Sequence, residues 1–246
     1  MSTQTNANAA PDISVIILCY RAGELVRTVV SRMKASLEAR GLSYELVLVG
    51  NYDESRKDTD TTPAVVRDIA LHDAHVIAIT EKKEGMFGWD VRSGLRAAQG
   101  KTVAFIDGDA QNPVEDVVRV YDARLEKGTD MAQTYRVKRH DGAQRIFISR
   151  MYNAMVAVLF PGVIVYDINS KPKIFTRDAL QKLRLTSDDW FIDAEIVIQA
   201  GKLGFTVAQI PTVFLKNEHR SSFVNVGTIF EFLRNLLRYR FFGPRV

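Results

Sequence analysis

Apolar, β-branched runs alternate with amphipathic segments through the first half of the chain, and this alternation constrains the fold more than any other feature of the sequence. The apolar runs, which we expect to be strands, cover residues 13–20, 44–49, 76–79 and 102–106. The segments between them, which we expect to be helices, cover residues 24–40, 63–71 and 88–99. Runs that are apolar along their whole length are typical of strands covered on both faces. The alternation therefore predicts an α/β fold in which right-handed crossovers join parallel strands.

The second half of the chain mixes helices and strands less regularly. Helices are expected over residues 113–127, 145–160, 177–185 and 191–203, and strands over 130–135, 174–175 and 206–210. A last helix, expected over 226–240, is amphipathic, with arginines near the edge of its apolar side. We therefore expect a disordered leader at 1–12, one domain at 13–225, and a basic C-terminal helix at 226–246 that packs on the domain, on a partner or on a membrane surface.

Composition limits the class of protein. Of the 246 residues, 46% are hydrophobic and 25% are charged, which is typical of a globular domain and excludes a largely disordered chain. The longest run without a charged side chain, residues 151–166, is too short to span a bilayer. The single cysteine, Cys19, excludes internal disulfides and predicts a reducing cytoplasm. Neither a dinucleotide glycine fingerprint nor a Walker phosphate loop follows an expected strand.

Positive charge is concentrated in two short windows, residues 134–150 and 219–246. Each window holds five Lys or Arg side chains against one acidic side chain, a net charge of 5 − 1 = +4, which equals the net charge of +4 for the whole chain. The rest of the chain is therefore net acidic. Clustered positive charge of this kind favours a phosphate-rich partner or an anionic surface, although solvated helix faces would give the same pattern.

The expected strand at 102–106 leads directly into two carboxylates, Asp107 and Asp109, which are separated by Gly108. Because glycine allows a sharp turn, the two side chains can converge on one hard cation. Oxygen ligands suit Mg²⁺ or Mn²⁺, and Gln111 can add a neutral oxygen. Ligands of open parallel sheets bind at the carboxyl ends of the strands. The sequence therefore predicts a metal site at the end of this strand.

About residues 13–223 resemble the family 2 glycosyltransferases of GT-A fold, and among them the dolichyl- or polyprenyl-phosphate sugar synthases. The resemblance includes Tyr20, the glycine-containing helix at 88–100, and Asp107-Gly-Asp-Ala-Gln-Asn-Pro113, which is similar to the family's D-A-D-L-Q-x-P motif. Later segments that match are Thr134–Arg136, Arg145–Ser149, Tyr166–Arg177, Phe191–Glu195, Ile210–Pro211 and His219–Ser222. The resemblance implies a GT-A-like α/β fold with a mostly parallel, Rossmann-like sheet flanked by helices.

The same resemblance implies an activity and a donor site. The implied enzyme is an inverting, metal-dependent glycosyltransferase that moves a sugar from a nucleotide-diphosphate sugar to a polyprenyl (dolichyl-like) phosphate. Asp107, Asp109 and Gln111 would hold Mg²⁺ or Mn²⁺ on the donor diphosphate, which makes Asp109 a catalytic candidate. The residues expected to bind the donor are Tyr20, Asp53, Asp107, Gly108, Asp109, Gln111, Glu195 and Arg220.

The resemblance places the acceptor phosphate on Arg136, Arg145 and Ser149. Arg145 and Ser149 are four residues apart, so in a helix they share one face. A planar guanidinium fork and a hydroxyl suit a phosphate group, and Arg145 is a catalytic candidate because it would hold the attacking group. Asp193 is the third catalytic candidate. Since a phosphate acceptor is already ionised and needs no base, Asp193 would orient the sugar or hold arginines.

Two alternatives stay open. One is a glycosyltransferase acting on a glycan or small-molecule hydroxyl, with Asp189 or Asp193 as the base. The other is a non-catalytic nucleotide-binding relative, suggested by departures from the family pattern. The second strand ends in Gly50-Asn51-Tyr52-Asp53 instead of an Asp-Asp pair, and Asp90 replaces a small residue where the diphosphate is expected. An extra carboxylate at that place would repel a diphosphate.

A lipid acceptor would require contact with a membrane surface. We therefore expect a cytoplasmic protein that associates peripherally with the cytoplasmic face of the membrane. A nucleotide sugar and a polyprenyl phosphate are its expected partners, and nucleic acid is not. Whether the chain forms a homo-oligomer is left open by the sequence.

Overall fold

A seven-stranded sheet organises the computed structural model, which describes residues 9–139, 143–163, 165–215 and 226–244, without the side chains of 138–139, 143–147 and 226–233. The strand order is β3-β2-β1-β4-β6-β5-β7. The strands are β1 (Ile13–Leu18), β2 (Tyr44–Val49), β3 (Val76–Ile79), β4 (Thr102–Asp107), β5 (Met131–Arg139), β6 (Lys173–Thr176) and β7 (Val207–Phe214). Only β6 runs antiparallel to its neighbours, β4 and β5. The predicted α/β class with a mostly parallel sheet is confirmed.

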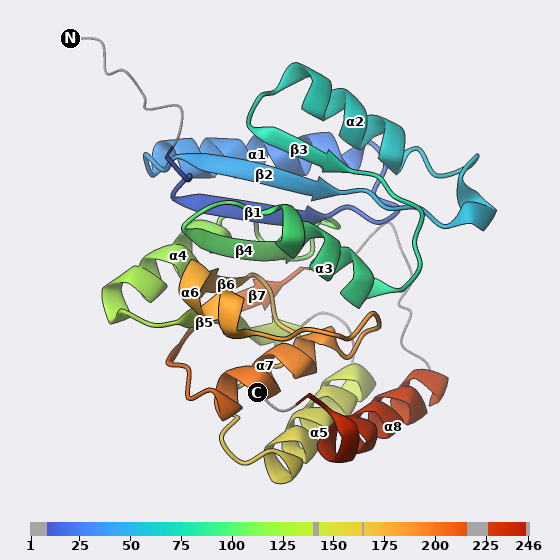
Figure 1. Cartoon of the computed structure of the whole chain (residues 1–246), viewed down its shortest axis with the longest axis vertical. Coiled ribbons are helices and arrows are strands. Elements are labelled where there is room, and N and C mark those ends of the chain that lie inside the picture. Colours follow the sequence, from blue (N-terminus) through green and yellow to red (C-terminus); the bar gives the residue numbers. More distant parts are fainter. Residues whose placement is uncertain (1–8, 140–142, 164, 216–225, 245–246) are drawn as a thin grey trace.

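Helices cover both faces of this sheet (Figure 1). They are α1 (Leu25–Ala39), α2 (Thr62–His72), α3 (Phe87–Ala97), α4 (Asp116–Lys127), α5 (Ala143–Leu159), α6 (Arg177–Lys182), α7 (Ile192–Lys202) and α8 (Val226–Phe242), with a short 3-10 helix at Glu54–Arg56. Val15 and Ile17 of β1 belong to the core beneath α1, α2 and α4. Ile16 and Leu18 belong to the opposite core, beneath α3, α5, α7 and α8. Successive side chains thus enter different cores, which explains the continuous apolar runs.

The sheet extends farther than the sequence predicts at one edge. β5 continues to Arg139 and β7 to Phe214, and the two strands pair in parallel. Pro211 lies within β7, opposite Tyr135. A proline is tolerated there because β7 pairs only with β5, so that one side of the strand needs no hydrogen-bond donor.

The C-terminal helix α8 packs on the domain through a few described side chains. Leu236 and Tyr239 are buried in the core that also contains α5 and α7. Gln199 Nε2 donates to the Tyr239 hydroxyl at 3.0 Å, which fixes α8 against α7. Beyond this contact, Phe241 and Phe242 remain 72% and 84% exposed. Within the described ranges, no helix combines the length and the apolarity needed to cross a bilayer.

Candidate active site

The carboxyl ends of the parallel strands β1, β2 and β4 lie side by side at the same end of the sheet. β1 and β4 are neighbours, and the strand order runs outward from them in opposite directions. Open α/β sheets bind ligands at such a switch point. Tyr20 follows β1, Asp53 follows β2, and Asp107 is the last residue of β4. Three of the side chains expected to bind the donor therefore come from strands that end at this edge.

The turn after β4 is held close to the end of β1. Gly108 N donates to Leu18 O at 2.9 Å, and a Cβ atom at Gly108 would lie 3.0 Å from the same oxygen. Glycine is therefore favoured at this close approach of two backbones, because a side chain would force Leu18 O to shift by a few tenths of an ångström. The left-handed residue of the turn is Ala110, with φ 60°. The turn-forming role that we expected for Gly108 thus falls to Ala110.

The turn presents oxygen atoms that suit a hard cation. Asp109 Oδ1 accepts a hydrogen bond from Gln111 N at 3.0 Å, and Asn112 Nδ2 lies 3.5 Å from Asp107 Oδ2. Asp107 and Asp109 are both partly exposed. Carboxylate and amide oxygens fit Mg²⁺ or Mn²⁺. Among the described residues no three His, Cys, Asp or Glu side chains gather in a metal-binding group. Water and the donor diphosphate would therefore have to complete the coordination.

Gln111 also connects this turn to the end of β7. Its backbone oxygen accepts from Leu215 N at 2.9 Å, and its Nε2 donates to Leu215 O at 3.1 Å. Leu215 is the last described residue before the segment 216–225. Arg220, expected to bind the donor, lies in that segment, outside the described residues. Leu215, where the described chain ends before residues 216–225, is therefore hydrogen-bonded to the turn after β4.

Two residues expected to bind the donor are in direct contact. The Tyr20 hydroxyl donates to Asp53 Oδ2 at 2.5 Å. Burial, the hydrogen bond to Asp53 and the charge of Asp53 raise the pKa of Tyr20 to about 12. The phenol therefore stays protonated and donates to the carboxylate at neutral pH. Asp53 is thereby fixed beside the end of β1.

The negative charge of Asp90 is compensated within the protein. Asp90 is buried, it forms an ion pair with Lys83, and its Oδ1 accepts from Asn51 Nδ2 at 2.9 Å. Asn51 Oδ1 accepts in turn from Glu81 N at 2.8 Å, and the Lys83 ammonium lies 4.3 Å from the centre of the Tyr20 ring. The expected repulsion of a diphosphate by Asp90 is therefore wrong, because Lys83 balances its charge. Asn51 and Lys83 were missed as members of this site.

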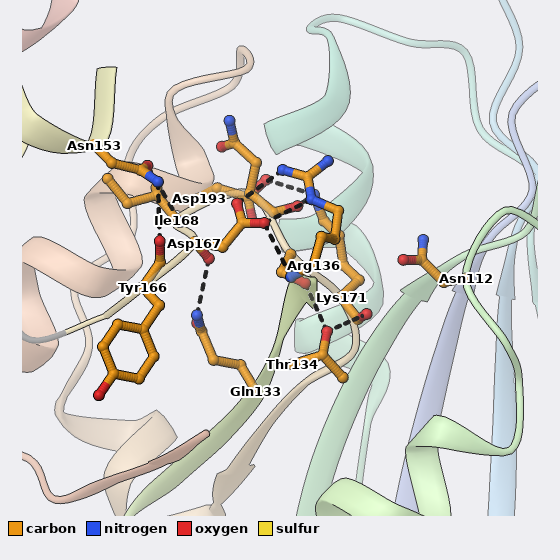
Figure 2. Close-up of polar contacts among 12 residues, drawn as sticks. Asn112, Gln133, Thr134, Arg136, Asn153, Tyr166, Asp167, Ile168, Lys171 and Asp193 are labelled. Atoms are coloured by element: carbon orange, nitrogen blue, oxygen red, sulfur yellow. Dashed lines mark hydrogen bonds and ion pairs between the residues drawn. The ribbon is translucent and has the colours of Figure 1, made fainter. Parts of the chain in front are cut away.

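Arg136 forms a nearly buried pair with Asp167 (Figure 2). Its Nε and Nη2 atoms donate to the two carboxylate oxygens at 2.6 and 2.8 Å, and each side chain is 9% exposed. The guanidinium plane is fixed by this bidentate contact, which is more directional than a single ion pair. Arg136 is thus oriented by the protein itself before any phosphate arrives.

Three amide side chains hold the segment that carries Asp167, and two of them, Gln133 and Asn153, are labelled in Figure 2. Asn153 Nδ2 of α5 donates to Tyr166 O at 3.0 Å, and Gln133 Nε2 of β5 donates to Asp167 O at 2.9 Å. Gln209 Oε1 of β7 accepts from Tyr166 N at 2.7 Å. Asp167 was not singled out from the sequence, although it lies in the matching segment 166–177. Its partner, Arg136, is 31 residues away in the sequence, so no local sequence pattern indicates the pair.

Asp193 is enclosed by two lysines. Lys171 Nζ lies 2.6 Å from Asp193 Oδ2 and Lys173 Nζ lies 2.9 Å from Oδ1, and all three side chains are nearly or fully buried. Burial alone would raise the pKa of Asp193, but the charges of Lys171 and Lys173 outweigh it and hold that pKa below its usual value. A buried carboxylate of lowered pKa is a poor proton acceptor. These contacts disfavour Asp193 as the base of the hydroxyl alternative, and they show it held by lysines and not by arginines.

Two further acids are occupied by main-chain contacts. Glu195 is fully buried, and its carboxylate accepts from Thr186 N and Ser187 N at 2.8–3.1 Å. The donor contact that we expected for Glu195 is thus corrected to support of the 186–187 loop. Asp189 Oδ1 accepts from Phe191 N at 2.9 Å, and its Oδ2 accepts from Asn235 Nδ2 at 2.7 Å. Both oxygens of this second candidate base are therefore engaged.

The other residues expected to hold the acceptor phosphate, Arg145 and Ser149, lie on α5. Ser149 is partly exposed. Arg145 lies one turn earlier in the same helix, and its side chain is outside the described residues. Asn153, one further turn along, connects α5 to the segment that holds Asp167 and hence Arg136. α5 and β5 are therefore joined through the residues that orient Arg136.

Comparison with known proteins identifies the family. Residues 14–191 match the family profile described as Glycosyl transferase family 2. The chain belongs to this family. The turn with Asp107 and Asp109, Tyr20 and the Arg136–Asp167 pair all lie within the matched residues. Helices α7 and α8 lie beyond them.

Several curated relatives of this glycosyl transferase family 2 chain carry the name undecaprenyl-phosphate 4-deoxy-4-formamido-L-arabinose transferase. The protein from Proteus mirabilis is 32% identical over 146 residues, which are 58% of this chain and 43% of that protein. The protein from Pseudomonas fluorescens is 26% identical over 215 residues, which are 85% of this chain and 59% of that protein. The chain thus spans about half the length of these relatives.

Solved structures of similar fold include glucosyl-3-phosphoglycerate synthase from Mycobacterium tuberculosis. Its complex with Mn²⁺, UDP and phosphoglyceric acid has a TM-score of 0.72 and 19% identity, over 96% of this chain and 80% of that chain. Its complex with Mn²⁺, UDP-glucose and glycerol 3-phosphate has a TM-score of 0.71 and 18% identity, over 96% and 82%. This similarity confirms the predicted GT-A-like fold.

Proposed function

We propose that the chain transfers a sugar, with inversion, from a nucleotide-diphosphate sugar to a polyprenyl phosphate. Family membership and the names of the curated relatives support the reaction class and the acceptor class. The Mn²⁺ and UDP named with the structural neighbour support a metal-dependent nucleotide donor. One observation in this chain supports a phosphate as the acceptor: Asp189 and Asp193, the acids considered as general bases, already form other contacts.

These contacts favour a phosphate acceptor over a hydroxyl acceptor. A hydroxyl must lose a proton during attack and needs a base, whereas a phosphate is already ionised near neutral pH. Asp193 lies between Lys171 and Lys173, and both oxygens of Asp189 accept hydrogen bonds. Neither side chain is placed to remove a proton from a substrate. This arrangement supports the phosphate acceptor.

In the proposed step, an oxygen of the acceptor phosphate attacks the anomeric carbon from the face opposite the leaving group. The bond between that carbon and the nucleoside diphosphate breaks, and no proton is transferred. Arg136 would hold the attacking phosphate together with Arg145 and Ser149. Because Asp167 already fixes the Arg136 guanidinium, little ordering remains to be done when the acceptor binds. Bringing two anions together in this way is a large part of the catalytic task.

On the donor side, Tyr20 and Asp53 would contact the nucleotide, and Asp107, Asp109 and Gln111 would hold Mg²⁺ or Mn²⁺. When bound, the metal stabilises negative charge on the departing diphosphate. Arg220 follows Leu215 by five residues, a reach of up to about 17 Å for extended chain. Since Leu215 is bonded to Gln111, we assign Arg220 to the diphosphate as well.

A panel of nucleotide sugars, assayed with and without polyprenyl phosphate, tests the proposal. We expect release of nucleoside diphosphate with at least one donor, only when both the lipid phosphate and Mg²⁺ or Mn²⁺ are present. Release that depends on a soluble hydroxyl acceptor instead would contradict the phosphate acceptor. Nucleotide binding without turnover for any donor would favour the non-catalytic relative. The Lys83–Asp90 ion pair argues against that last outcome, because it removes the unbalanced charge that suggested it.

We further propose that α8 brings the enzyme to an anionic membrane surface. Phe241 and Phe242 are exposed at its end, and Arg234, Arg238 and Arg240 are exposed along it. Aromatic side chains beside arginines favour the boundary between lipid headgroups and acyl chains. The buried contacts of Leu236 and Tyr239 place this helix on the same core as α5, which carries the proposed acceptor residues.

Co-sedimentation with vesicles tests this contact. We expect binding to vesicles that contain phosphatidylglycerol and much weaker binding to pure phosphatidylcholine. Replacing Phe241 and Phe242 together by serine should weaken binding at least about tenfold, because about 1.5–3 kcal/mol per aromatic side chain is gained on burial. Leu71→Ser is the control, since Leu71 is 82% exposed on α2 at a distant part of the sheet. Equal losses in the two variants would contradict the proposed surface.

A further inference from the structure

A polar hollow of about 250 Å³ opens between the end of β1 and the segment that joins β2 to α2. Its walls include Arg21 and Gly23 from the first loop and Arg56, Thr59, Asp60 and Thr61 from the second. The joining segment projects at the right of Figure 1. The hollow lies beside the amino ends of α1 and α2, and its lining residues do not include Asp107 or Asp109.

The two arginines of the hollow are not neutralised by an ion pair. Within the described part of the chain, neither the Arg21 nor the Arg56 side chain forms an ion pair or a hydrogen bond, and both are exposed. Some other exposed arginines do form ion pairs, such as Arg27 with Asp68 at 2.7 Å and Arg32 with Glu115 at 2.8 Å. Among the residues that line the hollow, the two guanidinium groups outnumber the single carboxylate of Asp60, so the lining attracts an anion.

The rest of the lining is polar. Asp60 Oδ1 accepts from Thr62 N at 3.0 Å, so this carboxylate is directed at the start of α2, where it offsets the positive end of the helix dipole. Thr59 and Thr61 contribute hydroxyl groups, which donate to phosphate oxygens. Arg21 itself is held in a left-handed conformation, with φ 55°, an unusual one for a residue with a side chain.

The hollow communicates with the donor site through Tyr20. Burial and Asp53 raise the pKa of the Tyr20 hydroxyl, and the charges of Arg21 and Arg56 act on the same hydroxyl in the opposite direction. Both guanidinium groups are therefore within electrostatic reach of the Tyr20–Asp53 hydrogen bond. An anion that neutralises them would change the potential at that bond.

We propose that Arg21 and Arg56 form an anion subsite for a phosphate group, separate from the metal-dependent diphosphate site at Asp107 and Asp109. The phosphate has two sources to distinguish: free inorganic phosphate or pyrophosphate, and a phosphate carried by a nucleotide. The subsite needs neither a metal nor a bound sugar. Its existence is therefore independent of the proposed sugar transfer.

Calorimetric titration of the full chain in EDTA, at fixed ionic strength and in a phosphate-free buffer, tests the subsite. The probes are inorganic phosphate, pyrophosphate and a nucleoside diphosphate. We expect phosphate or pyrophosphate to bind the unmodified chain, and the double variant Arg21→Gln/Arg56→Gln to bind it at least about tenfold more weakly. The matched control is Arg40→Gln/Arg184→Gln, which removes two exposed arginines from elsewhere in the molecule and should bind as the unmodified chain does.

Competition identifies the source of the phosphate. For this comparison the titrations are repeated with Mg²⁺, so that the metal-dependent diphosphate site can also bind the nucleoside diphosphate. If free phosphate is the ligand, phosphate and the nucleoside diphosphate then bind simultaneously, and the double variant loses only the first. If a nucleotide phosphate is the ligand, the two probes compete and the double variant loses both. Absence of phosphate and pyrophosphate binding to the unmodified chain, or equal weakening in the double variant and the control pair, overturns the subsite. A failed turnover assay would leave these titrations unchanged, so the two proposals fail separately.

Discussion

Replacing Asp109 by alanine is expected to lower metal-dependent sugar transfer by about a hundredfold to a thousandfold, the usual loss when one group that stabilises developing charge is removed. Asp109 is partly exposed and lies in a turn, so its loss should leave the fold intact. The measurement is the initial rate of nucleoside diphosphate release at saturating Mg²⁺ or Mn²⁺, with thermal unfolding recorded in parallel.

Two matched variants make this result specific. Asp109→Asn keeps an oxygen that can accept from Gln111 N but loses the negative charge, so it should be nearly as inactive as the alanine variant. Asp122→Ala removes the same charge from an exposed position on α4, where the ion pair with Arg40 contributes little. It should retain normal activity. Full activity of Asp109→Ala would end the assignment of the metal site.

Replacing Asp193 by alanine is expected to cost about 3–5 kcal/mol of unfolding free energy, because it leaves buried ammonium groups without their counter-charge. Lys171 and Lys173 both contact this carboxylate within a nearly closed interior. Asp178→Ala is the control, since Asp178 is exposed on α6 and its loss should stay within about 0.5 kcal/mol. Denaturant unfolding of both variants at pH 7 provides the comparison. Equal unfolding free energies for Asp193→Ala and Asp178→Ala would show that Lys171 and Lys173 do not need the Asp193 carboxylate as a counter-charge.

The pH dependence supplies an independent check on the same cluster. Burial lowers the pKa of Lys173 to about 8 in the folded chain, from 10.5 as its ordinary value. Between these values the unfolded chain binds more protons, so this group's contribution to stability rises with pH. Without Asp193 the pKa of Lys173 should fall further, and the window of rising stability should begin at lower pH. The deficit of Asp193→Ala should therefore shrink between pH 7 and pH 10.

The sequence predicted the sheet well where local pattern determines burial. β1, β2 and β4 are covered on both faces, and their uninterrupted apolar runs show it directly. The turn at the end of β4 was also predicted, and Asp107 and Asp109 lie in it, whereas their metal-binding role stays a prediction. β7 was cut short at Ile210 because Pro211 reads as a strand terminator, and only its place at the sheet edge permits it.

The sequence failed where buried polar side chains find partners far along the chain. Asp193 and Glu195 stand in the first turn of a helix, where acids are common for electrostatic reasons, and nothing local shows that both are buried. Asp193 pairs with Lys171 and Lys173, which are 22 and 20 residues earlier in the sequence. These pairs form because the segment around β6 packs against α7, which the sequence alone does not show. Lys83 compensates for Asp90 from a loop seven residues before it, which a motif comparison does not consider.

The paired hydrogen bonds between Gln111 and Leu215 join the turn after β4 directly to the end of β7, although β6 and β5 lie between these two strands in the sheet. A change in the conformation of the turn would therefore act on the far strand of the sheet without passing through the two strands between them.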